Sequence, residues 1–323
     1  METGNAIELK GVTKRFGDVI ANDNVNLTVR KGEILSILGE NGSGKTTLMN
    51  MLSGIYFPDE GEVYVDGKEV TIRSPKDSFA LGIGMIHQHF KLINILTAAE
   101  NIILGLPGKE KLNMKQVEKE IRELTEQYGF DLNPSQKIYD MSVSQKQTVE
   151  IVKVLYRGAD ILILDEPTAV LTPQETEKLF AVLRNMRKAG KSIIIITHKL
   201  NEVLELSDRV AVLRKGKYID TVETAKATVE SLTEMMVGEK VKLDINRTEP
   251  VGAEKRIEMR GITCKNKEGL KVLTEASFTA YSGEILGVAG ISGSGQKELL
   301  ESVAGLQPVS YTHLRAHETD SYL

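Results

Sequence analysis

The chain has 323 residues, of which 41% are hydrophobic and 27% are charged, so it can form one large domain and part of a second. Its net charge of -4 and its aromatic content of 5% predict no basic or stacking surface for nucleic acid. The single cysteine, Cys264, excludes an intrachain disulfide, and the longest aliphatic runs are too short to span a bilayer.

The first segment that indicates a chemistry is a glycine-rich stretch after a short apolar strand. The strand is expected at Ile34 to Leu38, and Gly39 to Thr46 then matches the phosphate-binding pattern G-x-x-x-x-G-K-S/T. Thr47 to Leu52 is expected to open a helix, whose N-terminus adds positive potential. Lys45 would reach the β and γ phosphates of a nucleotide, and the Thr46 hydroxyl would ligate magnesium. The residues expected to hold the nucleotide are Gly39, Asn41, Gly42, Ser43, Gly44, Lys45, Thr46 and Thr47.

Two side chains on either side of this loop have more than one interpretation. Phe16 either stacks on adenine or belongs to the core. Gln88 follows a strand expected at Ile83 to Ile86, where its amide would sense the metal and the attacking water. His87 and His89 flank it, and alternate strand residues share a face, so a His-Gln-His metal site is the alternative, without an apparent third ligand.

An amphipathic helix is expected from Met114 to Tyr128. Val117, Ile121, Leu124 and Tyr128 share one of its faces. Asn113 is the expected N-cap and Gly129 the expected stop. This helix lies between two candidate motifs of the nucleotide-binding core, which predicts a helical insertion.

Two further strands end in polar side chains. Ile161 to Leu164 precedes Asp165 and Glu166, which places both carboxylates at the carboxyl edge of a parallel sheet. Asp165 would hold magnesium through water, and Glu166 would orient and deprotonate the attacking water. By itself the pair is equally compatible with an acidic turn. His198 follows the strand at Ile193 to Ile196 and would contact the γ-phosphate, although a lone histidine is often structural.

The chain contains an internal duplication. Ile7 to Thr13 returns as Ile257 to Thr263, and Gly39, Gly44 and Gly54 correspond to Gly290, Gly295 and Gly305. The repeat predicts a first domain at 1-239, a charged linker at 240-256 and an incomplete second copy at 257-308. Residues 309-323 resemble a translated sequencing adapter and are expected to be a non-native tail, with a natural extension as the alternative.

The second copy has a degenerate phosphate loop. It keeps its glycines, but Gln296 stands where the lysine belongs and Lys297 replaces the magnesium hydroxyl. Losing one such electrostatic contact typically costs about 3 kcal/mol of transition-state stabilisation. A hydrolytically weak second site is therefore expected.

Together these motifs resemble an ABC ATPase. The phosphate loop, Gln88, Met141 to Gln145, Asp165 to Thr168 and Thr197-His198 have the order and spacing of that family, over residues 5 to 308. The resemblance implies an α/β P-loop NTPase of the ABC ATPase type, with a parallel-sheet core, an antiparallel β subdomain and a helical insertion, followed by a truncated second copy. It also implies ATP hydrolysis with ATP and Mg²⁺ as cofactors.

Met141 to Gln145 occupies the position of the family's signature, whose usual form is Leu-Ser-Gly-Gly-Gln. The resemblance implies that Ser142 and Gln145 contact the ATP held by the opposite domain. Met141, Val143 and Ser144 depart from the pattern, and a side chain at Ser144 would hinder close backbone approach. An ordinary serine helix cap is the alternative.

An intact first loop and a degenerate second one resemble the ATP-binding subunit of simple-sugar and nucleoside importers. Met85 to Phe90 and Ala99 to Gly105 resemble the nucleoside branch, with sugar importers as the alternative. A soluble ABC ATPase acting on ribosomes or DNA is a third reading, but its long linker or coiled-coil insertion is missing. The implied partners are two transmembrane permease subunits near Gln88 and Phe90 to Gly105, and indirectly a substrate-binding lipoprotein. The expected location is peripheral, on the cytoplasmic face of the cell membrane.

Overall fold

The computed structural model describes residues 4-88, 90-106, 113-239, 252-265, 271-290, 294-306, 309-310 and 313-316. The chain divides into two compact units, Met1–Val241 and Lys242–Leu323, which are considered separately. Their boundary falls inside the predicted linker at 240-256, of which residues 240-251 lie outside the described part.

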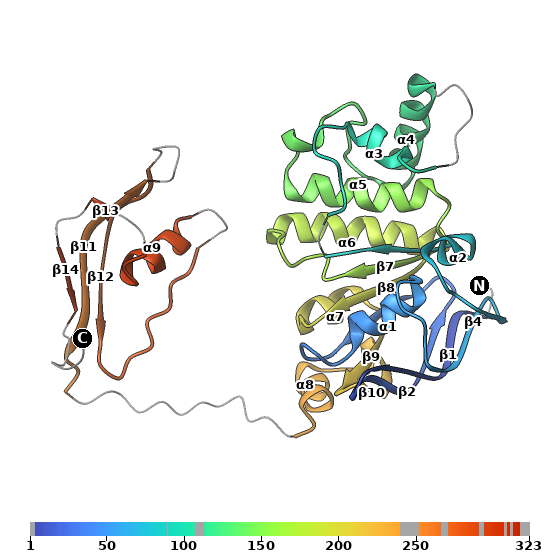
Figure 1. The fold of residues 1–323 in the computed structure, drawn as a ribbon, viewed down its shortest axis with the longest axis horizontal. Helices are drawn as coiled ribbons and strands as arrows, with labels where there is room; N and C mark the ends of the chain where they lie inside the picture. The colour runs from blue at the N-terminus through green and yellow to red at the C-terminus, as the bar shows by residue number, and fades with distance from the viewer. Residues whose placement is uncertain are drawn as a thin grey trace. The chain divides into compact units, whose positions relative to one another are not determined.

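A six-stranded sheet forms the centre of the first unit, in the order β10-β9-β3-β8-β7-β6 (Figure 1). All neighbouring pairs are parallel except β9 and β10. The three apolar strands predicted from the sequence are confirmed as β3, β7 and β8, and every residue of these strands is buried. The strands are β3 Ile34–Leu38, β6 Ile83–Ile86, β7 Ile161–Asp165, β8 Ser192–Thr197, β9 Arg209–Arg214 and β10 Lys217–Glu223.

A second, antiparallel sheet of four strands has the order β2-β1-β4-β5. Apolar residues from this sheet, from helix α1 and from one face of the central sheet share a hydrophobic cluster. Ile163 of β7 belongs to this cluster, whereas its neighbour Leu164 belongs to the cluster on the opposite face. The elements are β1 Asn5–Phe16, β2 Val19–Arg30, β4 Glu60–Val65, β5 Lys68–Val70 and α1 Lys45–Leu52.

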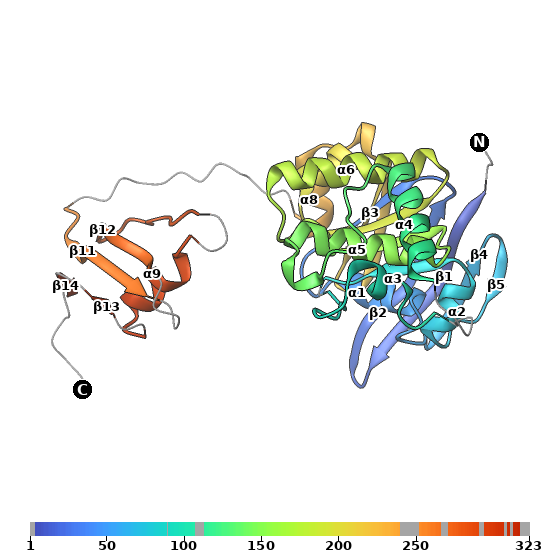
Figure 2. The same ribbon diagram turned by 90° about the horizontal axis from the view of Figure 1, so that it is seen from above.

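Helices cover the opposite face of the central sheet and form the predicted insertion. Helices α5 and α6 pack on that face through a second cluster. Helices α3, α4 and α5 lie side by side in both views and share a third cluster (Figures 1 and 2). The helices are α2 Pro75–Ala80, α3 Ala98–Ile103, α4 Met114–Tyr128, α5 Val143–Tyr156, α6 Pro173–Lys188, α7 Leu200–Leu206 and α8 Val229–Val237.

The predicted helix at 114-128 is confirmed together with both of its ends. The Asn113 side chain accepts a hydrogen bond from the Gln116 N–H, and Gly129 ends the helix at φ 84°.

Among the described residues, no helix has both the length and the apolar character needed to cross a membrane.

The second unit contains the hairpin of β11 (Lys255–Lys265) and β12 (Lys271–Tyr281), followed by helix α9 (Gln296–Val303). Its hairpin repeats local details of the first unit. Gly11 and Gly261 both have φ 61°, and each donates its N–H over 2.9 Å, to Asn26 Oδ1 and to Ser277 Oγ respectively. Strands β13 (Val309–Ser310) and β14 (His313–Ala316) run antiparallel to β11. That residues 309-323 are a non-native tail stays a prediction.

Candidate active site

The phosphate loop, which follows β3, packs closely against β9 and β2, and its glycines make this close approach possible. A Cβ at Gly39 would lie 2.3 Å from the Leu213 carbonyl oxygen and 2.5 Å from Ser43 Oγ. Gly44 caps α1 at φ 94°, where a Cβ would lie 2.4 Å from the Ala21 carbonyl oxygen. Close packing and a left-handed backbone therefore set the course of the loop.

Lys45 is folded onto the loop itself. Its Nζ donates to the carbonyl oxygens of Gly39 at 2.7 Å and Glu40 at 2.8 Å, and the residue is only 6% exposed. Burial lowers the pKa of Lys45, and the nearby charges of Glu166 and Asp165 oppose that shift. A partly desolvated ammonium is thus held next to the position where an anion would enter.

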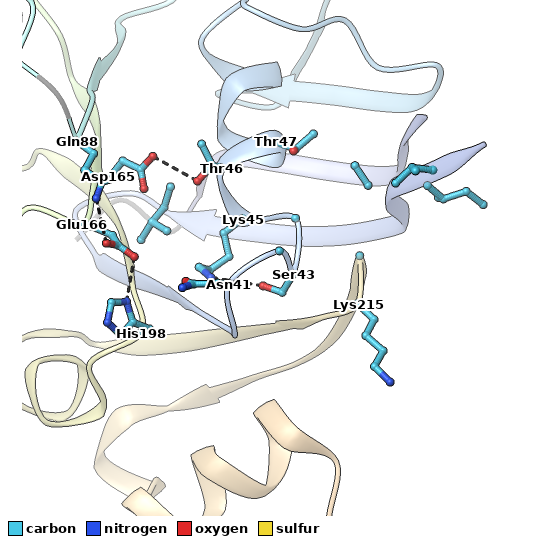
Figure 3. A pocket seen from close by; sticks show the side chains of 17 residues that line it. Asn41, Ser43, Lys45, Thr46, Thr47, Gln88, Asp165, Glu166, His198 and Lys215 are labelled. Carbon is cyan, nitrogen blue, oxygen red and sulfur yellow. Dashed lines mark hydrogen bonds and ion pairs between the residues drawn. The ribbon is translucent and has the colours of Figure 1, made fainter. Parts of the chain in front are cut away.

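The opposite wall begins with Asp165 at the end of β7. Thr46 Oγ1 donates to Asp165 Oδ2 at 3.3 Å, so two of the three residues predicted to hold magnesium, the third being Gln88, are brought together (Figure 3). Burial raises the pKa of Asp165, because the carboxylate loses solvation. Hydroxyl and carboxylate oxygens are the hard donors that Mg²⁺ prefers, so these side chains fit that ion.

Glu166 lies between two other predicted catalytic side chains, those of Gln88 and His198. Its Oε1 is 2.9 Å from His198 Nδ1, and its Oε2 accepts from Gln88 Nε2 at 3.5 Å (Figure 3). Glu166 has φ 46°, a left-handed conformation that is uncommon for a non-glycine residue and is often found at functional sites. Its N–H donates to the Ile196 carbonyl oxygen at 2.9 Å, which ties this turn to β8.

A cavity of about 720 Å³ joins the two walls. It is lined by Asn41 to Thr47 of the phosphate loop and by Gln88, Asp165, Glu166 and His198. Sequence reasoning missed several residues of its lining: Val19, Ile20, Ala21, Ile196, Lys215 and Gly216.

The missed Lys215 and Gly216 form the turn between β9 and β10. The Gly216 N–H donates to the Ser43 carbonyl oxygen at 3.2 Å, and the Asp23 N–H donates to the Gly216 carbonyl oxygen at 2.9 Å. The glycine at position 216 is the local turn signal in this stretch of the sequence. The sequence gives no sign, however, that this turn reaches the phosphate loop.

Known proteins match this arrangement. A family model described as "ABC transporter" matches residues 22-169. The bacterial ABC transporter cassette MJ0796, solved as a dimer, superposes with a TM-score of 0.59 at 30% identity, covering 68% of this chain and 98% of that cassette. The chain belongs to the ABC transporter ATP-binding cassette family.

Import ATP-binding proteins of this family are similar over most of the chain. The nucleoside import ATP-binding protein NupA of Lactococcus lactis is 48% identical over 99% of the chain. The glucose import ATP-binding protein TsgD13 of Haloferax volcanii is 42% identical over 97%. The chain spans 64% and 62% of the lengths of these two relatives.

Besides Gly39, three residues predicted to bind nucleotide in this ABC cassette do not line the cavity. Phe16 is 43% exposed, makes an edge contact with Tyr56 at 5.1 Å between ring centroids, and has Lys14 Nζ 5.5 Å from its ring. Ser142 and Gln145 form a capping box at the start of α5, in which Ser142 Oγ accepts from the Gln145 N–H at 3.3 Å. The geometry therefore includes the cap that sequence reasoning weighed as the alternative, and the nucleotide contacts of these three residues stay predictions.

The second phosphate loop is described in part, because residues 291-293 lie outside the described part of the chain. Gly295 begins α9 at φ 89°, as Gly44 begins α1. Gln296 Nε2 donates to the Val288 carbonyl oxygen at 3.2 Å. Gln296 thus turns back onto the segment just before its loop, whereas Lys45 bonds to the start of its own loop, and Gln296 carries no positive charge.

Proposed function

We propose that this chain is the ATP-binding and ATP-hydrolysing subunit of an ABC importer. The observation that carries the proposal is the pair of facing walls. Lys45 and Thr46 lie on one side of the 720 Å³ cavity, and Asp165, Glu166 and His198 lie on the other. The inferred partners are two transmembrane permease subunits, and indirectly a substrate-binding lipoprotein. The subunit would lie peripherally on the cytoplasmic face of the membrane.

Each of these side chains has a task in hydrolysis. The Lys45 ammonium exchanges the two carbonyl oxygens that hold it for phosphate oxygens of the bound ATP. Glu166 takes a proton from the attacking water at its carboxylate, and His198 keeps that carboxylate oriented over 2.9 Å. Thr46 and Asp165 would hold Mg²⁺, which supplies positive charge to offset the charge that develops on the phosphates.

We also infer that the second unit is a second, degenerate cassette whose residues 257-308 repeat the start of the first. The matching hairpins and the αL glycines before α1 and α9 support a second copy. The proposed division is 1-239, a linker at 240-256 and 257-308, although β11 already begins at Lys255. Because Gln296 carries no charge, this second site would bind phosphate more weakly and turn over slowly.

Nucleosides are the proposed cargo. The support is the 48% identity to a nucleoside import protein and the resemblance of Met85 to Phe90 and Ala99 to Gly105. His89 itself lies outside the described residues. A simple sugar is the second candidate, because a glucose import protein is 42% identical over nearly the same span.

Reconstitution with candidate permease and binding-protein subunits of a nucleoside importer tests the proposal. We expect nucleosides to stimulate phosphate release, whereas ribose and glucose leave it unchanged. In the same assembly Lys45→Ala should abolish transport, since the γ-phosphate loses its principal cation. Stimulation by sugars alone would move the assignment to the sugar branch. Unimpaired transport by Lys45→Ala would contradict the role of this loop.

A further inference from the structure

The contact between Glu166 and His198 joins two different segments of the chain. Glu166 directly follows β7, and His198 directly follows β8. About half of the His198 side chain is exposed, so packing constrains the imidazole only weakly. Contacts in the neighbouring backbone are therefore needed to keep the two side chains at 2.9 Å.

A closed ring of hydrogen bonds joins the same two segments just beyond this pair. Its members are Thr168, Lys199 and Glu202, and we call these three side chains the clamp. Thr168 comes two residues after the predicted base, and Lys199 directly follows the predicted histidine. Lys199 Nζ donates to the Thr168 carbonyl oxygen at 2.9 Å, to Thr168 Oγ1 at 3.2 Å and to Glu202 Oε1 at 2.9 Å. The Thr168 hydroxyl donates in turn to Glu202 Oε2.

The clamp is complete and is anchored in the first unit. An ammonium group has three N–H donors, and each donor of Lys199 has an acceptor in the ring. Thr168 is only 2% exposed, and the carbonyl oxygen of the preceding Pro167 accepts from Gln147 Nε2 at 2.7 Å. The Lys199 N–H donates to Thr197 Oγ1, at the end of β8, over 3.0 Å. Both segments are thus fixed within a few residues of the pair.

We propose that Lys199 is a positioning residue for ATP hydrolysis, which through Thr168 and Glu202 keeps the Glu166 carboxylate aligned with the His198 imidazole. The inference rests on the proposed function, and it adds the device that aligns the two side chains. General-base catalysis requires accurate geometry, and a misplacement of about 1 Å can lower a rate by about 10²-fold. No residue of the clamp lines the 720 Å³ cavity, so the clamp acts through the backbone and not through nucleotide contacts.

The chain offers a matched control for Lys199 at the opposite ends of the same two strands. Lys191 precedes β8, and its Nζ donates to the Ala159 carbonyl oxygen at 2.9 Å and to Asp160 Oδ1 at 2.6 Å, just before β7. Each lysine therefore joins the two strand ends through one backbone carbonyl oxygen and one carboxylate. Only Lys199 does so at the end that carries the site.

The test measures ATP turnover and equilibrium binding of Mg-ATP in the whole chain, assembled with candidate permease subunits of a nucleoside importer. Lys199→Met should lower turnover roughly 10–100-fold and leave the affinity for Mg-ATP unchanged, because the base is misplaced while the phosphate loop is intact. Lys191→Met should leave both quantities unchanged.

Conservative variants separate positioning from a loss of folding. Lys199→Arg keeps the charge and several N–H donors, and Thr168→Ser keeps the hydroxyl, so both should retain most of the turnover. Thr168→Val keeps the shape of the side chain but loses the hydroxyl, so it should lower turnover in the same direction as Lys199→Met. It tests the same clamp if Lys199→Met does not fold.

A combined substitution shows whether the clamp acts through Glu166. In a Glu166→Gln chain the base is already lost, so adding Lys199→Met should lower the residual turnover no further. A full additional loss in the double variant would overturn the inference, and so would normal turnover by both Lys199→Met and Thr168→Val. Normal turnover by Glu166→Gln alone would instead contradict the proposed function.

Discussion

At the scale of single residues, the site contains side chains whose charged forms are disfavoured by burial in the nucleotide-free protein. Lys45 and Asp165 are both largely buried, and burial shifts both pKa values toward the neutral forms. Such shifts cluster at functional sites, where a ligand later supplies the missing charge. In this chain the ligands would be the phosphates for Lys45 and Mg²⁺ for Asp165.

Asp165→Asn should therefore stabilise the nucleotide-free protein at neutral pH. The folded pKa of Asp165 lies above its unfolded value of about 3.9, so ionisation destabilises the fold as pH rises through that range. We expect the melting temperature of the variant at pH 7.5 to be roughly 2–4 °C higher. This is the shift that a gain of about 1 kcal/mol in the free energy of unfolding produces in a domain of this size. The difference should shrink as pH falls toward the unfolded value of about 3.9 and disappear below it, where ionisation of Asp165 no longer costs stability. Thermal unfolding without nucleotide or Mg²⁺ measures this difference in melting temperature. A lower melting temperature of Asp165→Asn than of the unaltered chain at pH 7.5 would contradict the prediction.

At the scale of elements, the sequence predicted what depends on local pattern. The helix at 114-128 was predicted to the residue because its apolar face, its Asn113 cap and its Gly129 stop are all local signals. The strand at Ile34 to Leu38 was predicted because a short aliphatic run before a phosphate loop is strongly constrained.

Features that depend on tertiary packing escaped prediction. The left-handed φ of Glu166 and the approach of Lys215 and Gly216 to the phosphate loop depend on which strands become neighbours. The contact of Phe16 with Tyr56 likewise joins the end of β1 to a loop after α1. Composition and periodicity do not contain this information.

The phosphate loop that follows β3 packs closely on β9, and a substitution in the loop tests this packing. Gly39→Ala should destabilise the protein by about 1–3 kcal/mol and weaken ATP binding, because its Cβ would lie 2.3 Å from the Leu213 carbonyl oxygen. Gly4→Ala is the matched control, since the nearest atom to its Cβ would be a Lys31 side-chain carbon at 3.9 Å. Denaturant unfolding and nucleotide titration measure both effects. Equal stability of the two variants would contradict the packing argument.

At the scale of the whole molecule, the parallel sheet gathers distant residues at one edge. Strands β3, β6, β7 and β8 end in Leu38, Ile86, Asp165 and Thr197, and the site residues follow directly or belong to those ends. This common edge explains why order and spacing along the sequence were enough to find most of the site. The signature at Ser142 does not line the same cavity, which is compatible with a site completed by another cassette.

The central claim is that Glu166 activates the water that attacks ATP bound at Lys45. The most direct measurement is phosphate release by Glu166→Gln, in the chain assembled with its permease partners, alongside equilibrium titration with Mg-ATP. Glu205→Gln is the control, because this exposed carboxylate pairs with Arg184 and does not line the cavity. We expect Glu166→Gln to bind Mg-ATP as tightly as the unaltered chain while its turnover falls roughly 10²–10⁴-fold. Normal turnover by Glu166→Gln would show that another group activates the water and would contradict the account.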